Sequence, residues 1–175
     1  MKLLPILAGL LLTASALAQD QKKFDVGSFS FERPESWQWV PVNSPMRKAQ
    51  LKVPGKDGAP AADITFFHFG PGQGGDVKSN ADRWLGQFKS KEGVSKIDQQ
   101  DINGTKVTIV TTEGSFSSGM PGGPTTTMEN AALLGAILQS TGGDVFVKMT
   151  GPIALVKETQ PQFMDFIKKA TAGKQ

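Results

Sequence analysis

Residues 132–149 read ALLGAILQSTGGDVFVKM, two apolar runs separated by a short segment with adjacent glycines. This arrangement predicts a β-hairpin, because Gly142 and Gly143 can adopt the positive φ angles of a tight turn. A strand that is apolar on both faces is typical of the centre of a layered fold. We therefore expect the hairpin in the middle of a covered sheet, with Leu133 and Ile137 on one face and Leu134 and Leu138 on the other.

A second hairpin signal precedes the first. Ile102-Asn103-Gly104-Thr105 leads into an alternating apolar run at 107–110, and Asn-Gly is typical of tight primed turns. Consecutive hairpins predict an antiparallel sheet. Further strands are expected in the first half of the chain, and the run at 64–69 is apolar on both faces, which predicts a strand covered on two sides. These upstream strands are expected near residues 29–31, 37–40, 46–53 and 62–69.

Two amphipathic helices complete the pattern. The first is expected over residues 77–88 with Asp76 as its cap, and its apolar face consists of Val77, Ala81, Trp84, Leu85 and Phe88. The second begins at Pro152 and runs towards the C-terminus, with Pro161 bending or restarting it through a capping box of Thr159 and Gln162. Strands and helices do not alternate along the chain. The pattern therefore predicts one α+β domain over 22–172, an antiparallel β-sheet flanked by helices.

The N-terminus predicts export. Residues 1–18 contain Lys2, an apolar run and a small-residue end, Ala16-Leu17-Ala18, as in a signal peptide cleaved after Ala18. The protein is then expected to be periplasmic or secreted, and no later apolar run is long enough for a transmembrane segment in the mature chain. The absence of cysteine excludes disulfides and a thiol nucleophile. The 19 Lys and Arg residues are scattered and leave a net charge of only +3, which indicates no nucleic acid partner.

Several strings of residues carry a resemblance. Phe29-x-Phe31-x-x-Pro34-x-x-Trp37, the element order, and a last hairpin running through Thr150-Gly151-Pro152 into a closing helix resemble the PsbP-like fold. That fold is an α/β/α sandwich on an antiparallel sheet, named for an extrinsic protein of the photosynthetic oxygen-evolving complex. Longer strings resemble a group of small exported bacterial proteins: PMRKAQ (45–50), FGPGQGG (69–75), RWLGQF (83–88) and KMTGP (148–152).

The resemblance implies a binding or assembly module that performs no catalysis and needs no cofactor, and nothing in it supports a photosystem role. We therefore expect a protein or envelope partner, contacted through the glycine-rich loops 70–75 and 114–127. The second segment is too long for an ordinary hairpin connection, and long loops in compact domains are often functional. Its Phe116 and Met120 would suit a recognition surface, although a merely mobile loop explains the composition equally well.

A small-ligand pocket at the 70–75 loop is the alternative. Gln73, Asn80, Arg83 and Gln87 could converge on an anion if the loop folds over the first helix, or they could form a solvated helix edge. The loop itself matches G-x-G-x-x-G, but a dinucleotide site needs a parallel strand next, and Asp76 would repel a pyrophosphate. A structural loop with a helix cap is favoured. A metal site lacks a compact carboxylate cluster, and calcium bound by loop carbonyls stays open.

A hydrolase is the least favoured interpretation. It would have to use His68, the single histidine, with Asp63, Asp76 or Glu129, whereas a strand-end histidine bonded to its neighbours is the simpler reading. Trp37 and Trp39 could form a stacking platform for a sugar or a protein edge, but packing in or beside the core is favoured. Structural hydrogen bonds or ion pairs are expected for three further charged residues, Arg47, Glu129 and Lys148.

Overall fold

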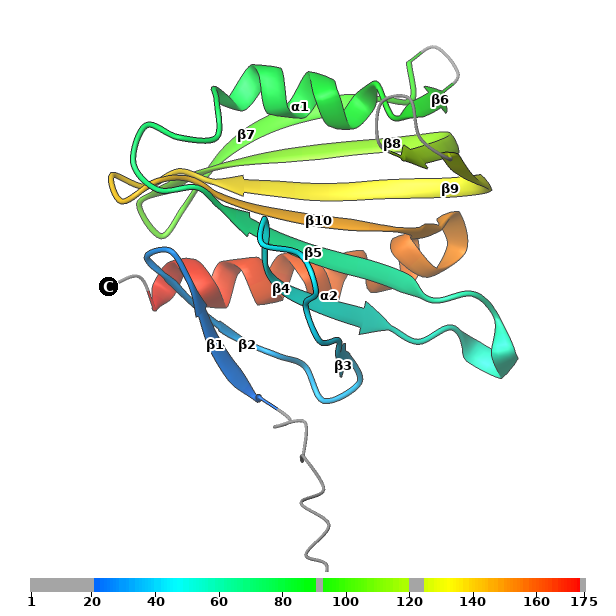
Figure 1. Cartoon of the computed structure of the whole chain (residues 1–175), viewed down its shortest axis with the longest axis horizontal. Coiled ribbons are helices and arrows are strands. Elements are labelled where there is room, and N and C mark those ends of the chain that lie inside the picture. The colour runs from blue at the N-terminus through cyan, green and yellow to red at the C-terminus, as the bar shows by residue number, and fades with distance from the viewer. Residues whose placement is uncertain (1–20, 91–92, 120–124, 174–175) are drawn as a thin grey trace, which may run out of the picture.

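An antiparallel sheet forms the centre of the molecule (Figure 1). The computed structural model describes residues 21–90, 93–119 and 125–173, so the predicted signal peptide lies outside the described residues. The eight strands follow the order β3-β4-β5-β10-β9-β8-β6, and β7 also pairs with β8. They are β3 (Gln38–Trp39), β4 (Arg47–Val53), β5 (Ala62–His68), β6 (Phe88–Ser90), β7 (Lys96–Ile102), β8 (Thr105–Gly119), β9 (Thr125–Leu138) and β10 (Val145–Pro152).

Both predicted hairpins are confirmed and lie side by side. Val145 of β10 pairs with Leu138 of β9, so the stretch 132–149 provides two adjacent strands at the centre of the sheet. The β7–β8 turn has φ angles of 53° at Asn103 and 75° at Gly104, as expected for an Asn-Gly turn. Leu133 and Ile137 pack on one side of β9, and Leu134 and Leu138 on the other, again as predicted.

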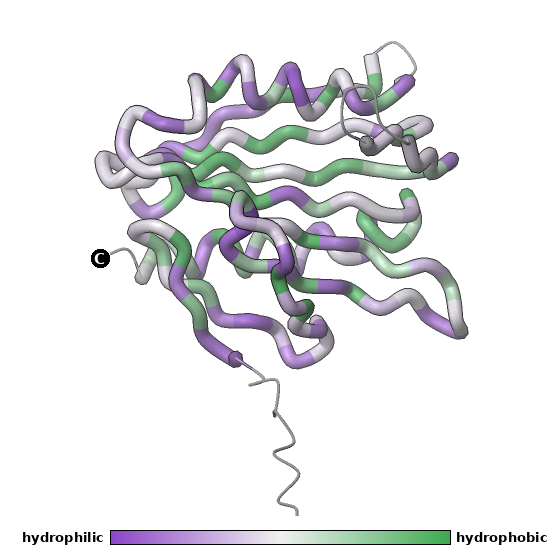
Figure 2. The backbone as a smooth tube through the Cα atoms, in the orientation of Figure 1, coloured by the Kyte–Doolittle hydropathy of each residue, from purple (hydrophilic) through white to green (hydrophobic). Residues whose placement is uncertain are grey.

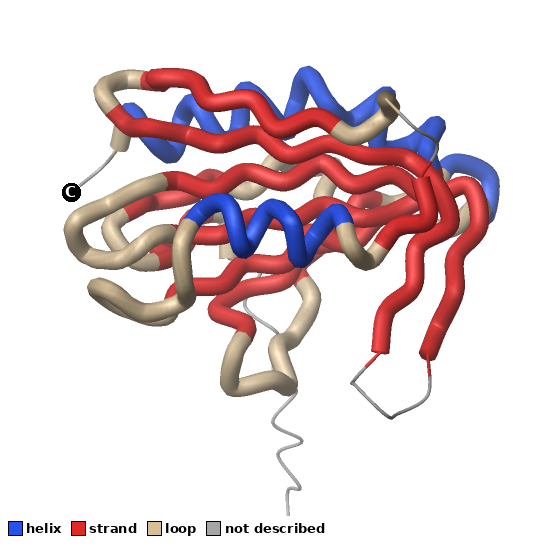
Figure 3. The backbone as a smooth tube through the Cα atoms, turned by 90° about the horizontal axis from the view of Figure 1, so that it is seen from above, coloured by secondary structure: helices blue, strands red, loops and turns tan. Residues whose placement is uncertain are grey.

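The two faces of the sheet carry different covers (Figure 3). Helix α2 (Ile153–Ala172) lies across one face together with a hairpin of β1 (Lys23–Val26) and β2 (Phe29–Glu32). Strand β2 matches the strand expected near residues 29–31, whereas β1 and its pairing with β2 were not predicted. Helix α1 (Val77–Leu85) lies over part of the other face, where Trp84 packs with Phe146. Figure 2 shows apolar residues gathered in the central strands between these covers. The predicted α+β fold is therefore confirmed.

The predicted helix 77–88 ends earlier than expected. Helix α1 stops at Leu85, and Gly86 donates its N–H to the carbonyl of Asp82 as the helix closes. Phe88 still packs in the same apolar cluster, but it does so from strand β6, where it pairs with Phe116. A short strand was missed because an apolar residue at helical spacing is equally compatible with a turn into the adjacent strand.

The segment 114–127 was wrongly predicted to be a loop. Residues up to Gly119 continue β8 and residues from Thr125 begin β9, and cross-strand pairs such as Ser118 with Thr126 extend the hairpin. Serine and glycine have no strong strand preference of their own, so this extension depends on pairing with the partner strand. Met120 lies outside the described residues.

Two other local predictions also need correction. Strand β5 is not fully covered on both faces, because Asp63 is exposed and Phe67 is only half-buried. Helix α2 is continuous through Pro161 and is not restarted there, and Thr159 is buried in its interior face. Helix α2 packs against the sheet and β2, and this packing stabilises the helix although Pro161 removes one backbone hydrogen bond. Within the described ranges, no helix is long and apolar enough to cross a membrane.

The N-terminal cap of α1 provides a first test of this local structure. Asp76 accepts a hydrogen bond from the backbone N–H of Ser79 at 2.9 Å. Asp76→Ala removes this acceptor, and we expect the free energy of unfolding to fall by about 1 kcal/mol, measured by urea denaturation. Asp76→Ser is the matched control because serine also caps well. If Asp76→Ser destabilises as much as Asp76→Ala, the cap is not the cause.

Candidate functional site

A groove opens on the face of the sheet that α1 only partly covers. One hollow of about 760 Å³ lies over β5, β10 and the far half of the β8–β9 hairpin. A second hollow of about 570 Å³ lies between the sheet and α1. The two share Phe67, Gln87 and Lys148, so they are parts of one concavity. We refer to them together as the α1-face groove.

One wall of the groove is the outer part of the β8–β9 hairpin, which bends towards the α1 side of the sheet (Figure 3). The bend coincides with an irregularity in strand register between Gly114 and Phe116. Glycine is required here, since a Cβ atom at Gly114 would lie 2.2 Å from the backbone oxygen of Lys89 in β6. The bend places one side of the hairpin against the groove, with Phe116, Ser118, Thr126 and Met128 in its lining.

Three cationic side chains from three different elements meet at the groove. Lys148 projects from β10 near the middle, Arg47 comes from the start of β4, and Arg83 comes from α1. The Lys148 ammonium donates a hydrogen bond to Gln87 and lies 5.1 Å from the centre of the Phe116 ring. Burial, and then the charges of Arg83 and Arg47, lower the pKa of Lys148 to about 8. The groove therefore concentrates positive charge around a partly desolvated amine.

Among the described residues, none of these three cations has a carboxylate as a direct ion-pair partner. Arg47 donates to the side chain of Gln50 at 2.7 Å and Arg83 donates to Asn80, both of them neutral acceptors. Ion pairs between described residues are made by other lysines, namely Lys22, Lys56, Lys78, Lys157 and Lys169. Asp63 lines one end of the groove, but it is absent from the interactions that shift the pKa of Lys148. An arriving anion would thus supply the missing counter-charge.

The Lys148 pKa implies a specific pH dependence of stability. Because about 8 lies below the ordinary value of 10.5, the unfolded chain binds more protons between these two pH values. The free energy of unfolding should therefore receive a contribution that rises with pH through this window. We expect urea midpoints at pH 7.5, 9 and 10.5 to show this rise, superimposed on the titration of other groups. The difference between wild type and Lys148→Met isolates it, and a difference that is constant with pH would contradict the lowered pKa.

The two halves of the groove differ in chemistry. The half beside α1 is aromatic, and its side chains include Met46, Phe67, Phe69, Trp84 and Phe146. The half beside the bent hairpin has many hydroxyl groups, from Thr65, Ser118, Thr126 and Thr150. Lys148 lies at the junction of the two halves. The arrangement suits a ligand with an apolar part, a central anion and hydrogen-bonding groups beyond it.

The structure separates the four residues predicted around the 70–75 loop. Arg83 and Gln87 line the groove, as the anion-pocket alternative expected. Asn80 is buried, and its amide donates to the carbonyls of Gly74 at 2.8 Å and Asp76 at 2.9 Å, so it holds the loop in place. Gln73 is exposed, and the loop contributes only Gly74 to the lining. Phe116, predicted on a recognition loop, instead lies in strand β8 of the bent hairpin.

His68 lies at the end of β5 among backbone groups. Its Nε2 atom is 3.1 Å from the carbonyl oxygen of Gly142, and its ring lies close to Gly27. The carboxylates considered for it lie elsewhere, since Asp76 caps α1 and Glu129 accepts a hydrogen bond from Ser115. Asp63 lies on the same strand at an odd spacing from His68 and therefore projects from its opposite face. The predicted hydrogen bond between a strand-end histidine and its neighbours agrees with this geometry.

The tryptophan pair does not form a surface platform. Trp37 is fully buried against Phe166, and its Nε1 atom donates to Gln162 at 2.8 Å. Trp39 is half-buried and packs edge-on against Phe24. The prediction that both pack in or beside the core is therefore confirmed. Within the described ranges, no group of three His, Asp or Glu side chains could hold a metal ion.

Arg47 and Lys148 make the structural hydrogen bonds that were predicted for them, to Gln50 and Gln87, but the sequence did not indicate that both also line the groove. Alternation in β10 places Lys148 on the same face as Phe146 and Thr150, which is visible in the sequence. The convergence of Lys148 with Arg47 depends on β5 being the single strand between β4 and β10. Only the strand order of the sheet reveals this arrangement.

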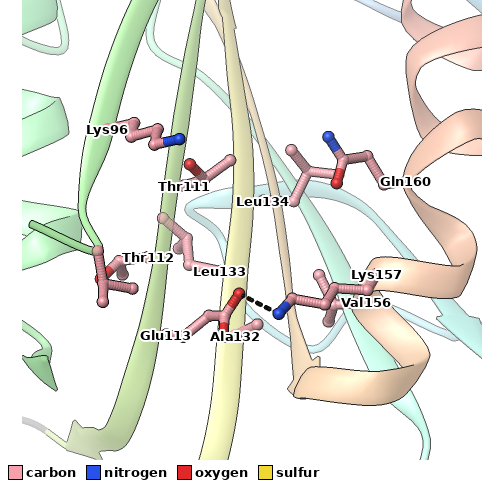
Figure 4. Close-up of a pocket in the computed structure, with 11 residues that line it drawn as sticks. Lys96, Thr111, Thr112, Glu113, Ala132, Leu133, Leu134, Val156, Lys157 and Gln160 are labelled. Atoms are coloured by element: carbon pink, nitrogen blue, oxygen red, sulfur yellow. Dashed lines mark ion pairs between the residues drawn. The ribbon is translucent and has the colours of Figure 1, made fainter. Parts of the chain in front are cut away.

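A smaller hollow of about 260 Å³ lies on the other face, between α2 and strands β7 to β9 (Figure 4). Lys157 of α2 reaches across it to Glu113 of β8, with 2.8 Å between the charged atoms. Lys96, Thr111 and Gln160 also line it (Figure 4). Lys157 already has a carboxylate partner, and this hollow is smaller than either part of the α1-face groove. The α1-face groove is therefore the stronger candidate.

This protein has a PsbP-like α+β fold, an antiparallel sheet flanked by helices. It is similar to cyanobacterial PsbP (CyanoP) from Synechocystis sp. PCC 6803, with a TM-score of 0.54 and 10% identity over 92% of this chain and 98% of that one. A protein of unknown function, PA94 from Pseudomonas aeruginosa, matches 83% of this chain and 92% of its own, with a TM-score of 0.43 and 14% identity. No protein-family model and no curated protein sequence match the chain. The comparison with CyanoP confirms the resemblance in fold.

Proposed function

We propose that this protein is an exported binding module that performs no catalysis and that holds an anionic group of its partner in the α1-face groove. The observation that carries the proposal is the cluster of Lys148, Arg47 and Arg83, which has no direct carboxylate partner in the part of the chain that the structure describes. Export is supported by the signal-like pattern of residues 1–18. The position of His68, bonded to a backbone carbonyl away from the groove, supports a role without chemistry.

Physical chemistry favours an anion at this position. Bringing three positive charges together is costly, more so when one of them is partly buried, and the cost is relieved when a counter-charge binds. A carboxylate or phosphate at Lys148 would accept charge-assisted hydrogen bonds, each worth about 1.5–3 kcal/mol. An anion would also favour the charged form of Lys148 and raise its pKa, so binding near pH 8.5 should take up protons.

The test is a titration of the protein with sodium citrate or poly-glutamate at constant ionic strength, monitored by two-dimensional NMR of the backbone amides. We expect saturable shifts at Thr65, Phe67 and Lys148, and at least a tenfold loss of affinity in Lys148→Met. Lys106→Met is the matched control, since Lys106 is exposed near the start of β8, and the groove is lined by residues near the end of that strand. Shifts spread over all surface lysines, or equal affinity in Lys148→Met and wild type, would overturn the proposal.

A further inference from the structure

We infer that the occupant of the α1-face groove is an extended acidic peptide segment of a partner protein, with an Asp or Glu next to a large apolar residue. This inference rests on the proposed anion-binding function and specifies the ligand. It follows from the length of the groove, from the division of its lining into an aromatic and a hydroxyl half, and from the position of the cations between them.

The groove has the length of a short peptide. Its lining extends from Arg47 on β4 to Phe116 on β8, and the strand order β4-β5-β10-β9-β8 places four strand spacings between them. At about 4.8 Å per spacing, this span is about 19 Å. An extended chain advances at most about 3.3–3.6 Å per residue, so about five or six residues would cross the sheet. A simple anion such as phosphate would fill only the region around Lys148.

The aromatic half offers a site for an apolar side chain. Phe67 and Phe69 are half-buried, and their rings stack at 6.5 Å between centroids. Met46 at the edge of this half is 59% exposed, one of two large apolar side chains that stand out in the described part of the chain. Flexible methionines are common at surfaces that adapt to peptide ligands. A large apolar residue here would cover side chains that are now in water.

The cations determine where the acidic residue lies. Lys148 belongs to both hollows, with Arg83 in the aromatic half and Arg47 in the hydroxyl half. A carboxylate at Lys148 is therefore adjacent to an apolar neighbour on the same peptide. In the other half, the hydroxyls of Thr150 and Ser118 can donate to and accept from peptide backbone groups. The Thr65 hydroxyl donates to the carbonyl of Lys148 and can still accept. A rigid small anion does not present the donors and acceptors of a peptide backbone.

The experiment is selection of peptides from a displayed library of random heptapeptides on the purified protein, with counter-selection on Lys148→Met. We expect enriched peptides to combine an acidic residue with an adjacent aromatic or large aliphatic one. The best peptide, made with a fluorescent label, should lose at least tenfold in affinity with Lys148→Met and about fivefold with Met46→Ala. The matched control for the second variant is Ile97→Ala, because Ile97 is exposed on β7 outside the groove.

Each of the following outcomes overturns the inference. No enrichment over the Lys148→Met variant, or enrichment of peptides without acidic residues, excludes an acidic segment. Equal loss with Met46→Ala and Ile97→Ala, or none with either, excludes the apolar anchor. Saturable binding of phosphatidylglycerol vesicles that displaces the peptide and is lost in Lys148→Met would assign the groove to a membrane. If citrate still titrates the groove in any of these cases, the proposed anion-binding function stands while the peptide assignment fails.

Discussion

Replacing Phe166 by alanine is expected to destabilise the protein by about 3–5 kcal/mol. Phe166 is only 3% exposed, and its ring centroid lies 5.2 Å from that of Phe31, 5.1 Å from that of Trp37 and 6.1 Å from that of Phe66. The side chain thus joins α2 to the β1–β2 hairpin, the segment before β3 and the sheet. Removing it leaves a cavity between elements that cannot close together without breaking other contacts.

The measurement is equilibrium urea unfolding with two probes, far-UV circular dichroism and tryptophan fluorescence. Typical domains have only 5–15 kcal/mol of stability, so a loss of this size is a large fraction of the total. Gln160→Ala, at an exposed position of the same helix, is the control and should stay within about 0.5 kcal/mol of wild type. A loss below about 1 kcal/mol in Phe166→Ala would mean that the aromatic cluster is not the main link between α2 and the sheet.

The second large effect is expected for Gly135→Val in the centre of β9. A Cβ atom at Gly135 would lie 2.4 Å from Cζ3 and 2.7 Å from Cε3 of Trp84, so the indole packs directly on the glycine backbone. A branched side chain would push α1 away from the sheet, and overpacking of this kind costs about 1–3 kcal/mol. Because α1 carries Arg83, we also expect weaker binding of anions in the groove.

A double-mutant cycle tests this explanation. In a Trp84→Ala background, the space of the indole is free, and Gly135→Val should cost much less than in wild type. The coupling is measured as the difference in unfolding free energy across the four proteins. Additive effects would show that Gly135→Val acts through strand propensity or another contact. The same four proteins, titrated with citrate, report whether displacement of α1 changes the groove.

Local sequence signals predicted the central hairpins well because their causes are local. Asn103-Gly104 supplies the φ angles of its turn, and two apolar faces on β9 require cover on both sides. The cap at Asp76 was likewise predicted, since capping depends on a few neighbouring residues. The β1–β2 hairpin and the extension of β8 to Gly119 were missed because their pairing partners decide them.

The candidate site was predicted only in part. Arg83 and Gln87 were proposed from their spacing on one helix, and both line the groove, but Asn80 of the same stripe is buried beneath the loop. Whether a polar side chain of α1 faces the groove or bonds to the preceding 70–75 loop depends on how that loop folds over the helix. Lys148 carried no distinct signal, since one lysine in a strand usually lies in solvent.

The sequence by itself determined the fold class, the central hairpins and the cap of α1, because alternation, turn chemistry and helical spacing act over a few neighbouring residues. The tertiary structure decided which charges meet. Arg47, Arg83 and Lys148 are far apart in the chain. Arg47 and Lys148 come together because only β5 lies between β4 and β10 in the sheet, and Arg83 joins them because Gly135 allows Trp84 to pack α1 closely on the sheet. The groove arises from strand order and close packing, and these depend on contacts between distant residues.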